Sequence, residues 1–228
     1  MIAMFRIAVL ASGRGTNLRA LIAAIAANRL DARIAGVFSD RSSAGALALA
    51  AAGGIPAKAL SPRGFETRLA YDEALFSLIE GVQPDLIVCA GYMRLLSEHV
   101  VDARRGRMIN IHPSLLPAFK GLHTHRQALD AGATVHGASV HFVTPELDGG
   151  PVISQATIPV LPGDDEEALA ARVLTREHPL LVDTVGLICA GRVALSGRGQ
   201  VMFDSAELHA PLSLGDDDRL RIPQRDTA

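Results

Sequence analysis

The sequence predicts an α/β protein: a single domain with a doubly wound, mostly parallel β-sheet. First, continuous apolar runs alternate with helical patterns through the first half of the chain, which is typical of parallel strands covered by helices on both faces. Second, a glycine-rich loop, SGRGTN, follows the first apolar run. Third, two apolar runs in the second half are joined by the turn-rich PELDGG, so we expect the C-terminal part of the sheet to be mixed.

Each predicted element follows from residue type and spacing. Short apolar runs rich in Val and Ile predict strands at 5–11, 32–39, 55–60, 84–90, 108–112, 138–144 and 151–160. Leu- and Ala-rich segments at helical spacing predict helices at 18–27, 44–52, 65–80, 123–131 and 164–190. Asn17 is expected to cap the first helix, and Gly53 with Gly54 to end the second. A further short helix is expected after the GYMR turn at 91–94.

Composition excludes several classes of protein. Of 228 residues, 22 are Lys or Arg and 24 are Asp or Glu, so no strongly basic field exists to hold nucleic acid. No apolar run approaches the roughly 20 residues of a membrane span. Cys89 and Cys189 lie in apolar runs and are expected to be free thiols in a reducing, cytoplasmic setting. We expect one domain at 1–203, followed by a polar, peripheral tail at 204–228.

The SGRGTN loop lies between the first predicted strand and helix, where backbone N–H groups and the helix dipole can bind an anion. The dinucleotide pattern would need a third glycine at position 18, and Leu18 is there instead. The Walker pattern requires a Lys-Ser or Lys-Thr pair after the glycines, and the sequence has no such pair there. The loop therefore fits a single phosphate or small anion better than NAD or ATP, with a plain strand–helix turn as the alternative.

The stretch MINIHPSLLP carries the polar pair Asn110 and His112, which must share one face of a strand. Pro113 cannot donate to a sheet ladder, so it places His112 at the strand's end. The pair is either satisfied at a sheet edge or presented to a cleft. In the second case Asp148, in the glycine-containing ELDGGP turn, is the candidate partner that favours a charged imidazole. Asn110 would offer an N–H to a developing oxyanion.

Other chemistries are poorly supported. His123 and His125 could ligate a metal, but they lack the cysteine or carboxylate spacing of a zinc motif. Ser114 lacks the G-x-S-x-G setting of a serine nucleophile. We therefore expect neither a metal site nor a serine nucleophile.

Over roughly residues 5–192 the chain resembles the folate-dependent phosphoribosylglycinamide formyltransferases of purine synthesis. The segments that carry the resemblance are VLASGRGTNL, PDLIVCAGYMRLLS, INIHPSLLPAFKGLHTHRQAL and HGASVHFVTPELDGGPVISQA. The resemblance implies a formyl transferase that moves the formyl group of its co-substrate, 10-formyltetrahydrofolate, to the amine of glycinamide ribonucleotide. It implies small-molecule partners, no metal, and a monomer or homodimer.

The resemblance also assigns residues. Asn110, His112 and Asp148 match the family's catalytic trio. The implied binding residues are Gly15, Thr16 and Asn17 for the ribonucleotide phosphate, Glu177 near the glycinamide amine, and, for formyl-folate, Arg68, Met93, Arg94, Leu95, Leu96, Asn110, Thr144, Pro145, Glu146, Leu147 and Asp148.

Three alternatives stay open at this point. Methionyl-tRNA formyltransferases share the N-x-H-P-S and D-G-G motifs but resemble this core plus a C-terminal RNA-binding barrel, for which the 36 residues after Arg192 are too few. Formyltetrahydrofolate hydrolases carry an N-terminal regulatory domain, whereas this chain starts at the first predicted strand. A non-catalytic nucleotide-binding module would not need the Asn–His–Asp trio.

Overall fold

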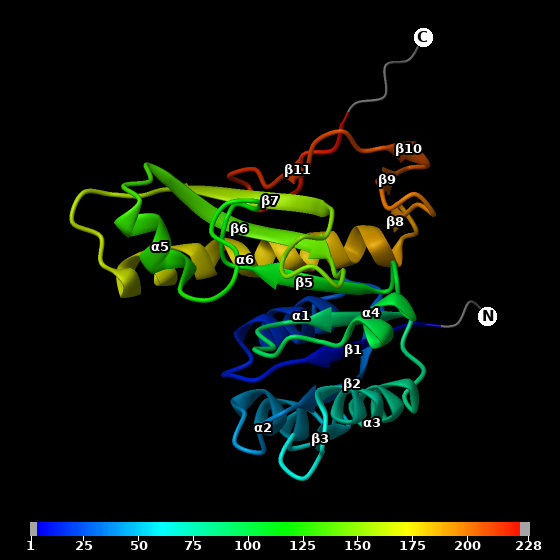
Figure 1. Ribbon diagram of the computed structural model, residues 1–228. Helices are drawn as coiled ribbons and strands as arrows, with labels where there is room; N and C mark the ends of the chain where they lie inside the picture. The colour runs from blue at the N-terminus through cyan, green and yellow to red at the C-terminus, as the bar shows by residue number, and fades with distance from the viewer. Residues whose placement is uncertain (1–3, 224–228) are drawn as a thin grey trace.

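The computed structural model describes residues 4–223 (Figure 1). Its N-terminal part comprises β1 Phe5–Leu10, α1 Thr16–Ala26, β2 Ala32–Ser39, α2 Gly45–Ala52, β3 Ala57–Ala59, α3 Arg68–Glu80, β4 Leu86–Cys89, α4 Glu98–Asp102 and β5 Met108–His112. The C-terminal part comprises α5 Thr124–Asp130, β6 Val135–Phe142, β7 Val152–Pro159, α6 Glu166–Cys189, β8 Val193–Leu195, β9 Val201–Phe203, β10 Ala206–Glu207 and β11 Leu212–Ser213. The end of the predicted tail, residues 224–228, lies outside the described residues.

Eight strands form one sheet in the order β11-β7-β6-β5-β4-β1-β2-β3. Strands β3, β2, β1, β4 and β5 are all parallel to their neighbours in this order. Strand β6 is antiparallel to both β5 and β7, and the edge strand β11 is parallel to β7. The predicted α/β fold, with a mostly parallel sheet that becomes mixed toward its C-terminal part, is confirmed.

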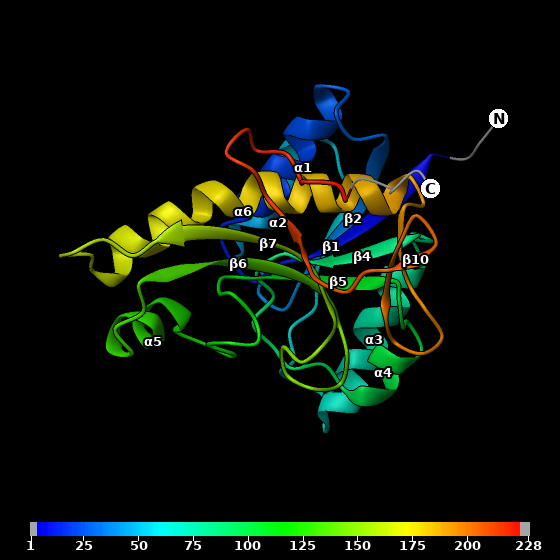
Figure 2. The ribbon, with the colours of Figure 1, turned by 90° about the horizontal axis from the view of Figure 1, so that it is seen from above.

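Helices cover both faces of the sheet, with α1 and α6 on one side and α3 and α4 on the other (Figure 2), and each face has its own hydrophobic core. Along β1, Ile7 and Val9 belong to the core under α1, α2 and α6, whereas Ala8 and Leu10 belong to the core under α3 and α4. All four side chains are fully buried. Burial on both faces explains why β1 reads as a continuous apolar run rather than as an alternating one.

Two helix starts differ from the prediction. Gly15, with a left-handed φ of 78°, occupies the N-cap position of α1, and Asn17 lies inside the first turn. Helix α3 begins at Arg68 because the Thr67 hydroxyl caps it, accepting the Ala70 N–H at 3.1 Å. Strand β3 is shorter than predicted, and β6 begins three residues earlier because its ladder with β7 extends to its first residue.

The segment from residue 204 packs along the edge of the main sheet and against α6. Its side chains Leu212, Leu214 and Leu220 are buried, and the Leu220 N–H donates to the Asp183 carboxylate of α6 at 3.0 Å. Strands β8, β9 and β10 form a small antiparallel sheet beside it (Figure 1), which was not predicted. The division into a domain at 1–203 and a peripheral tail stays a prediction.

The predicted free thiols are present, since Cys89 and Cys189 have no disulfide partner in the described part of the chain. Burial raises the pKa of the Cys89 thiol to about 12, so this cysteine is held as a neutral, unreactive thiol. Within residues 4–223 no helix has both the length and the apolar character that crossing a bilayer requires.

Candidate active site

The loops that follow β1 and β4 leave neighbouring strands where the sheet order, β3-β2-β1-β4-β5, changes direction. Such a switch point opens a crevice outside the carboxyl ends of the strands. A cavity of about 840 Å³ lies there, within the usual size range for small-molecule sites. It is lined by both loops, the end of β5, the loop between β6 and β7, and the N-terminal half of α6.

Asn110 and His112 lie on the same face of β5, as their spacing predicted, and both line the cavity. Strand β5 is parallel to β4 on one side and antiparallel to β6 on the other. We call the antiparallel pair of β5 and β6 the seam. Across the seam Asn110 stands opposite His141, and His112 stands opposite Ser139.

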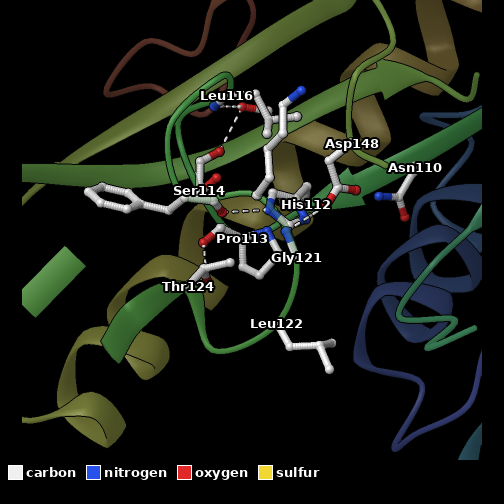
Figure 3. A network of polar contacts seen from close by, with 12 residues as sticks. Asn110, His112, Pro113, Ser114, Leu116, Gly121, Leu122, Thr124 and Asp148 are labelled. Carbon is white, nitrogen blue, oxygen red and sulfur yellow. Dashed lines mark hydrogen bonds and ion pairs between the residues drawn. The ribbon is translucent and has the colours of Figure 1, made fainter. Parts of the chain in front are cut away.

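Asp148 reaches the seam from the loop between β6 and β7, as Figure 3 shows. One of its carboxylate oxygens, Oδ2, lies 3.5 Å from Nδ1 of His112 and accepts the Gly121 N–H at 2.9 Å. The residue has a left-handed backbone, with φ of 45°, a conformation that Asp tolerates better than most side chains. Following Asp148, Gly150 must lack a side chain, since a Cβ there would lie 1.8 Å from the Phe142 carbonyl oxygen.

The His112 ring is held at both nitrogens. Nδ1 faces Asp148, and Nε2 lies 3.1 Å from the Phe119 carbonyl oxygen (Figure 3). The Phe119 loop is itself fastened to the Asp148 loop, because Lys120 pairs with Glu146 at 2.8 Å. Since an acceptor lies beside each ring nitrogen, the orientation of the His112 ring in the cavity wall is fixed.

His141 is a site residue that the sequence reasoning missed. Its Nδ1 lies 2.9 Å from the Phe142 carbonyl oxygen, its Nε2 lies 3.1 Å from the Asn110 amide nitrogen, and Asp148 Oδ1 is 3.8 Å away. Burial lowers the pKa of His141, which favours the neutral ring. A neutral ring that donates from Nδ1 to a carbonyl can accept the Asn110 N–H at Nε2. The register between β5 and β6 places His141 in the site, and the residue pattern of one strand alone does not give that register.

The glycine loop between β1 and α1 contributes to the same cavity. The Asn17 amide nitrogen donates to the Glu177 carboxylate of α6 at 2.9 Å, and both residues line the cavity. Burial raises the pKa of the Glu177 carboxyl group, and the bond from Asn17 partly opposes that shift. Arg14 also lines the cavity, whereas Gly15 and Thr16 lie between these lining residues without bordering it among the described residues.

Gly15 is required for close packing. A Cβ at this position would lie 2.8 Å from the Ala46 Cα, and the φ of 78° disfavours other residues. The glycine therefore lets the loop approach α2 while its backbone turns into α1.

One wall of the cavity is apolar and exposed at its rim. The side chains of Met93, Leu95, Leu122 and Leu147 are between 47% and 64% exposed, which marks a surface suited to an apolar or aromatic ligand. The predicted formyl-folate residues that line this cavity are Met93, Arg94, Leu95, Leu96, Asn110, Thr144, Pro145, Glu146, Leu147 and Asp148.

Arg68 does not line the cavity. It is the first residue of α3 and is exposed. A role for Arg68 in binding formyl-folate stays a prediction. Within residues 4–223 no group of three or more His, Cys, Asp or Glu side chains is arranged to hold a metal ion.

Comparison with known proteins agrees with this geometry. The family model described as formyl transferase matches residues 5–185. The chain is 47% identical over 189 residues to a phosphoribosylglycinamide formyltransferase of Escherichia coli (strain K12), an alignment that covers 83% of this chain and 89% of that protein.

Two solved structures help to separate the alternatives. A phosphoribosylglycinamide formyltransferase from Coxiella burnetii has a TM-score of 0.86 and 42% identity, covering 90% of this chain and 96% of its own. A formyltetrahydrofolate deformylase from Pseudomonas syringae has a TM-score of 0.80 and 27% identity, covering 89% of this chain but 66% of its own. The resemblance first seen in the motifs is confirmed: the chain belongs to the formyl transferase family.

Proposed function

We propose that this protein is a phosphoribosylglycinamide formyltransferase, which moves a formyl group from 10-formyltetrahydrofolate to the amine of glycinamide ribonucleotide in purine biosynthesis. One observation carries the proposal. A single cavity is lined both by the Asn17–Glu177 pair, at the N-terminus of α1, and by the Asn110, His112 and Asp148 side chains. An anion-binding site and a carbonyl-activating site thus open onto one cavity, where two substrates bound side by side can occupy both.

The binding roles follow from the chemistry of each wall. The N-terminus of α1, with Gly15, Thr16 and Asn17, offers N–H groups to the ribonucleotide phosphate. Glu177, which is hydrogen-bonded to Asn17 and lines the cavity, would accept a hydrogen bond from the glycinamide amine. The exposed apolar rim around Met93 and Leu147 suits the flat ring system and linker of the folate.

The reaction needs little base catalysis. An α-amino group has a pKa near ~8, so a useful neutral fraction exists near pH 7. The amine nitrogen attacks the formyl carbon, the bond from that carbon to N10 of the folate breaks, the amine loses a proton and N10 gains one. The chain has to stabilise the oxyanion and to direct the proton between the two nitrogens.

The seam side chains fit these two tasks. The Asn110 amide, oriented by His141 at 3.1 Å, donates to the developing oxyanion with its second N–H. The imidazolium form of His112 donates to the same oxygen once its Nε2 exchanges the Phe119 carbonyl for the substrate. Asp148 orients His112 from the other side of the ring and accepts the amine proton through a water molecule.

A formyl-folate hydrolase is the alternative from the same family, and the structural likeness to a deformylase gives it a concrete form. A hydrolase uses water as the nucleophile and needs no second substrate site. The buried Asn17–Glu177 pair at the N-terminus of α1 favours the transferase, because it gives the cavity a second polar group of residues, besides those of the seam, that a second substrate can bind.

An absorbance assay for folate release, with and without glycinamide ribonucleotide, tests the proposal. We expect release from 10-formyltetrahydrofolate only when the ribonucleotide is present, with formylated ribonucleotide detected by mass spectrometry. Release without ribonucleotide would identify a hydrolase, and no release in either condition would identify a non-catalytic binder.

Two further expectations belong to the proposal. Free, buried Cys89 and free Cys189 support a cytoplasmic setting, because free thiols persist in reducing compartments. Both a monomer and a homodimer are compatible with a cavity formed within one chain, and sedimentation velocity would distinguish them.

A further inference from the structure

We propose that Ser12 is a positioning residue that couples the ribonucleotide site to the formyl-folate site. This inference rests on the proposed function, and it concerns how the two substrates influence each other's binding. Ser12 does not line the cavity among the described residues. It is the first residue of the SGRGTN loop, two residues before Arg14, which does line the cavity.

Three hydrogen bonds fasten Ser12 to the other loops. Its backbone N–H donates to the Gly91 carbonyl at 2.9 Å, its hydroxyl accepts the Met93 N–H at 3.0 Å, and the same hydroxyl donates to the Asp40 carboxylate at 2.6 Å. Gly91 and Met93 both line the cavity on the folate side. Ser12 therefore joins the loop that begins α1 to the loop that forms the apolar wall.

The direction of these bonds is determined by Asp40. A hydroxyl has one proton, and a carboxylate offers acceptor atoms only, so the Ser12 proton must point to Asp40. The lone pairs of the hydroxyl are then left for the Met93 N–H. Ser12 and Asp40 are only 4% and 8% exposed, so water competes little for either bond.

The sheet topology explains why this serine can act on both sites. Ser12 follows β1, Asp40 follows β2, and Gly91 with Met93 follow β4, which are three adjacent strands in the order β4-β1-β2. Ser12 thus lies at the centre of the switch point, between the phosphate end and the folate end of the crevice. A ligand that fixes either loop also fixes the other loop through this residue.

The expected consequence is reciprocal coupling of binding. When one substrate orders one loop, the second substrate has less ordering left to do, and linkage requires that the effect be equal in both directions. Without the Ser12 hydroxyl, the Met93 N–H loses its partner, and of the two bonds from Ser12 to this loop only the backbone bond to Gly91 is left. The two substrates should then bind almost independently.

Isothermal titration calorimetry with glycinamide ribonucleotide and tetrahydrofolate, which together do not react, measures this coupling. For the wild-type protein we expect each ligand to tighten the other about tenfold, a typical coupling. Ser12→Ala and the nearly isosteric Ser12→Cys should reduce that factor to about twofold or less, because alanine lacks the acceptor and a thiol is a weak one. Ser12→Thr keeps a hydroxyl and should retain the coupling.

Ser154→Ala is the matched control. Ser154 is a fully buried serine whose hydroxyl meets Thr184 at 2.6 Å, outside the cavity lining. It should lower the melting temperature without changing the coupling, which separates positioning from a general loss of stability.

The outcomes that overturn the inference are specific. Tenfold coupling retained in Ser12→Cys, or no coupling in the wild-type protein, would each contradict it. Because no turnover is needed, a wild-type protein that shows the coupling but transfers no formyl group would contradict the proposed function and leave this inference standing. Binding of neither ligand would contradict both.

Discussion

The parallel region of the sheet and the antiparallel seam contribute to the same cavity in different ways. The parallel strands β1 and β4 contribute mainly the loops that follow them, together with Cys89 at the end of β4, so they offer backbone N–H groups and an apolar rim. In the seam, strand pairing itself sets side chains from β5 and β6 against each other: Asn110 meets His141 at 3.1 Å, although 31 residues separate them.

The comparison separates binding from chemistry. Loops at the ends of parallel strands can adapt to a ligand, whereas residues on paired strands are held by the ladder on both sides. Strand β5 belongs to both regions, being parallel to β4 and antiparallel to β6. Two candidate reacting groups, Asn110 and His112, thus lie on a strand that is paired on both sides, and Asp148 joins them from the loop between β6 and β7. Changes in the two regions should therefore affect different kinetic constants.

Asp148→Asn should produce the largest effect. The amide keeps the size of the side chain but removes the charge beside His112 and the acceptor for the amine proton, so kcat should fall about 10³-fold, within the range of general acid–base catalysis. Steady-state kinetics with both substrates measures it. The control is Asp130→Asn, which changes an exposed carboxylate paired with Arg126 and should leave kcat unchanged. An equal loss of kcat in both variants would contradict the assignment of the chemistry to the seam and Asp148.

Gly15→Ala should act on binding instead. Its Cβ would meet the Ala46 Cα at 2.8 Å and displace the loop that begins α1, so we expect KM for the ribonucleotide to rise about tenfold with little change in KM for formyl-folate. Gly54→Ala is matched to it, because Gly54 also has a positive φ, of 67°, but no atom lies within 4 Å of the added carbon. If Gly54→Ala raised KM equally, backbone strain rather than the clash at the loop would be the cause.

A pH effect on stability should come from His136, a buried residue of β6. Burial, together with the nearby His125 and His112, lowers the pKa of His136 to about 4 from an ordinary 6.5. The native state therefore binds fewer protons than the unfolded state between these values, and stability present above pH 6.5 is lost as the pH falls toward 4. When the melting temperature is plotted against pH across this range, His136→Asn should give a shallower slope than the wild-type protein.

The exposed His209 provides the control for that measurement. His209→Asn should keep the wild-type slope of melting temperature against pH. A wild-type slope in His136→Asn would show that other groups carry the acid sensitivity.

Thr67→Ala should give the smallest effect. It removes the hydroxyl that caps α3 by accepting the Ala70 N–H, and loss of such a cap lowers the free energy of unfolding by about 1 kcal/mol. Chemical denaturation should detect this loss, while kcat should stay at the wild-type value. Thr67→Ser keeps a capping hydroxyl and should unfold like the wild type. An equal destabilisation of Thr67→Ser would show that the lost methyl group, and not the cap, lowers the free energy of unfolding.

Sequence reasoning worked where the signal is local. The period of β5 places Asn110 and His112 on one face, and continuous apolar runs such as β1 reveal strands buried on both sides. It failed where the signal depends on distant pairing: His141 enters the site through the register between β5 and β6. In the polar tail, Leu212 is buried because β11 pairs with β7, a contact that composition does not encode.

Asn17 shows a third kind of limit. Its residue type is typical of a helix cap, yet Gly15 takes that position because its left-handed backbone fits the close approach to α2. The Asn17 amide is thereby free to bond Glu177, which is 160 residues away. Local helix-capping preference predicted that Asn17 caps α1, whereas in the fold its side chain bonds Glu177 and lines the cavity.

Single-turnover formyl transfer at saturating concentrations of both substrates tests the separation of binding from chemistry most directly, using Thr16→Val for the phosphate loop and His112→Ala for the seam. With binding saturated, Thr16→Val should react at nearly the wild-type rate, whereas His112→Ala should react about 10²–10³-fold more slowly, the usual loss for one oxyanion donor. A wild-type rate for His112→Ala, or equal losses in both variants, would contradict the account.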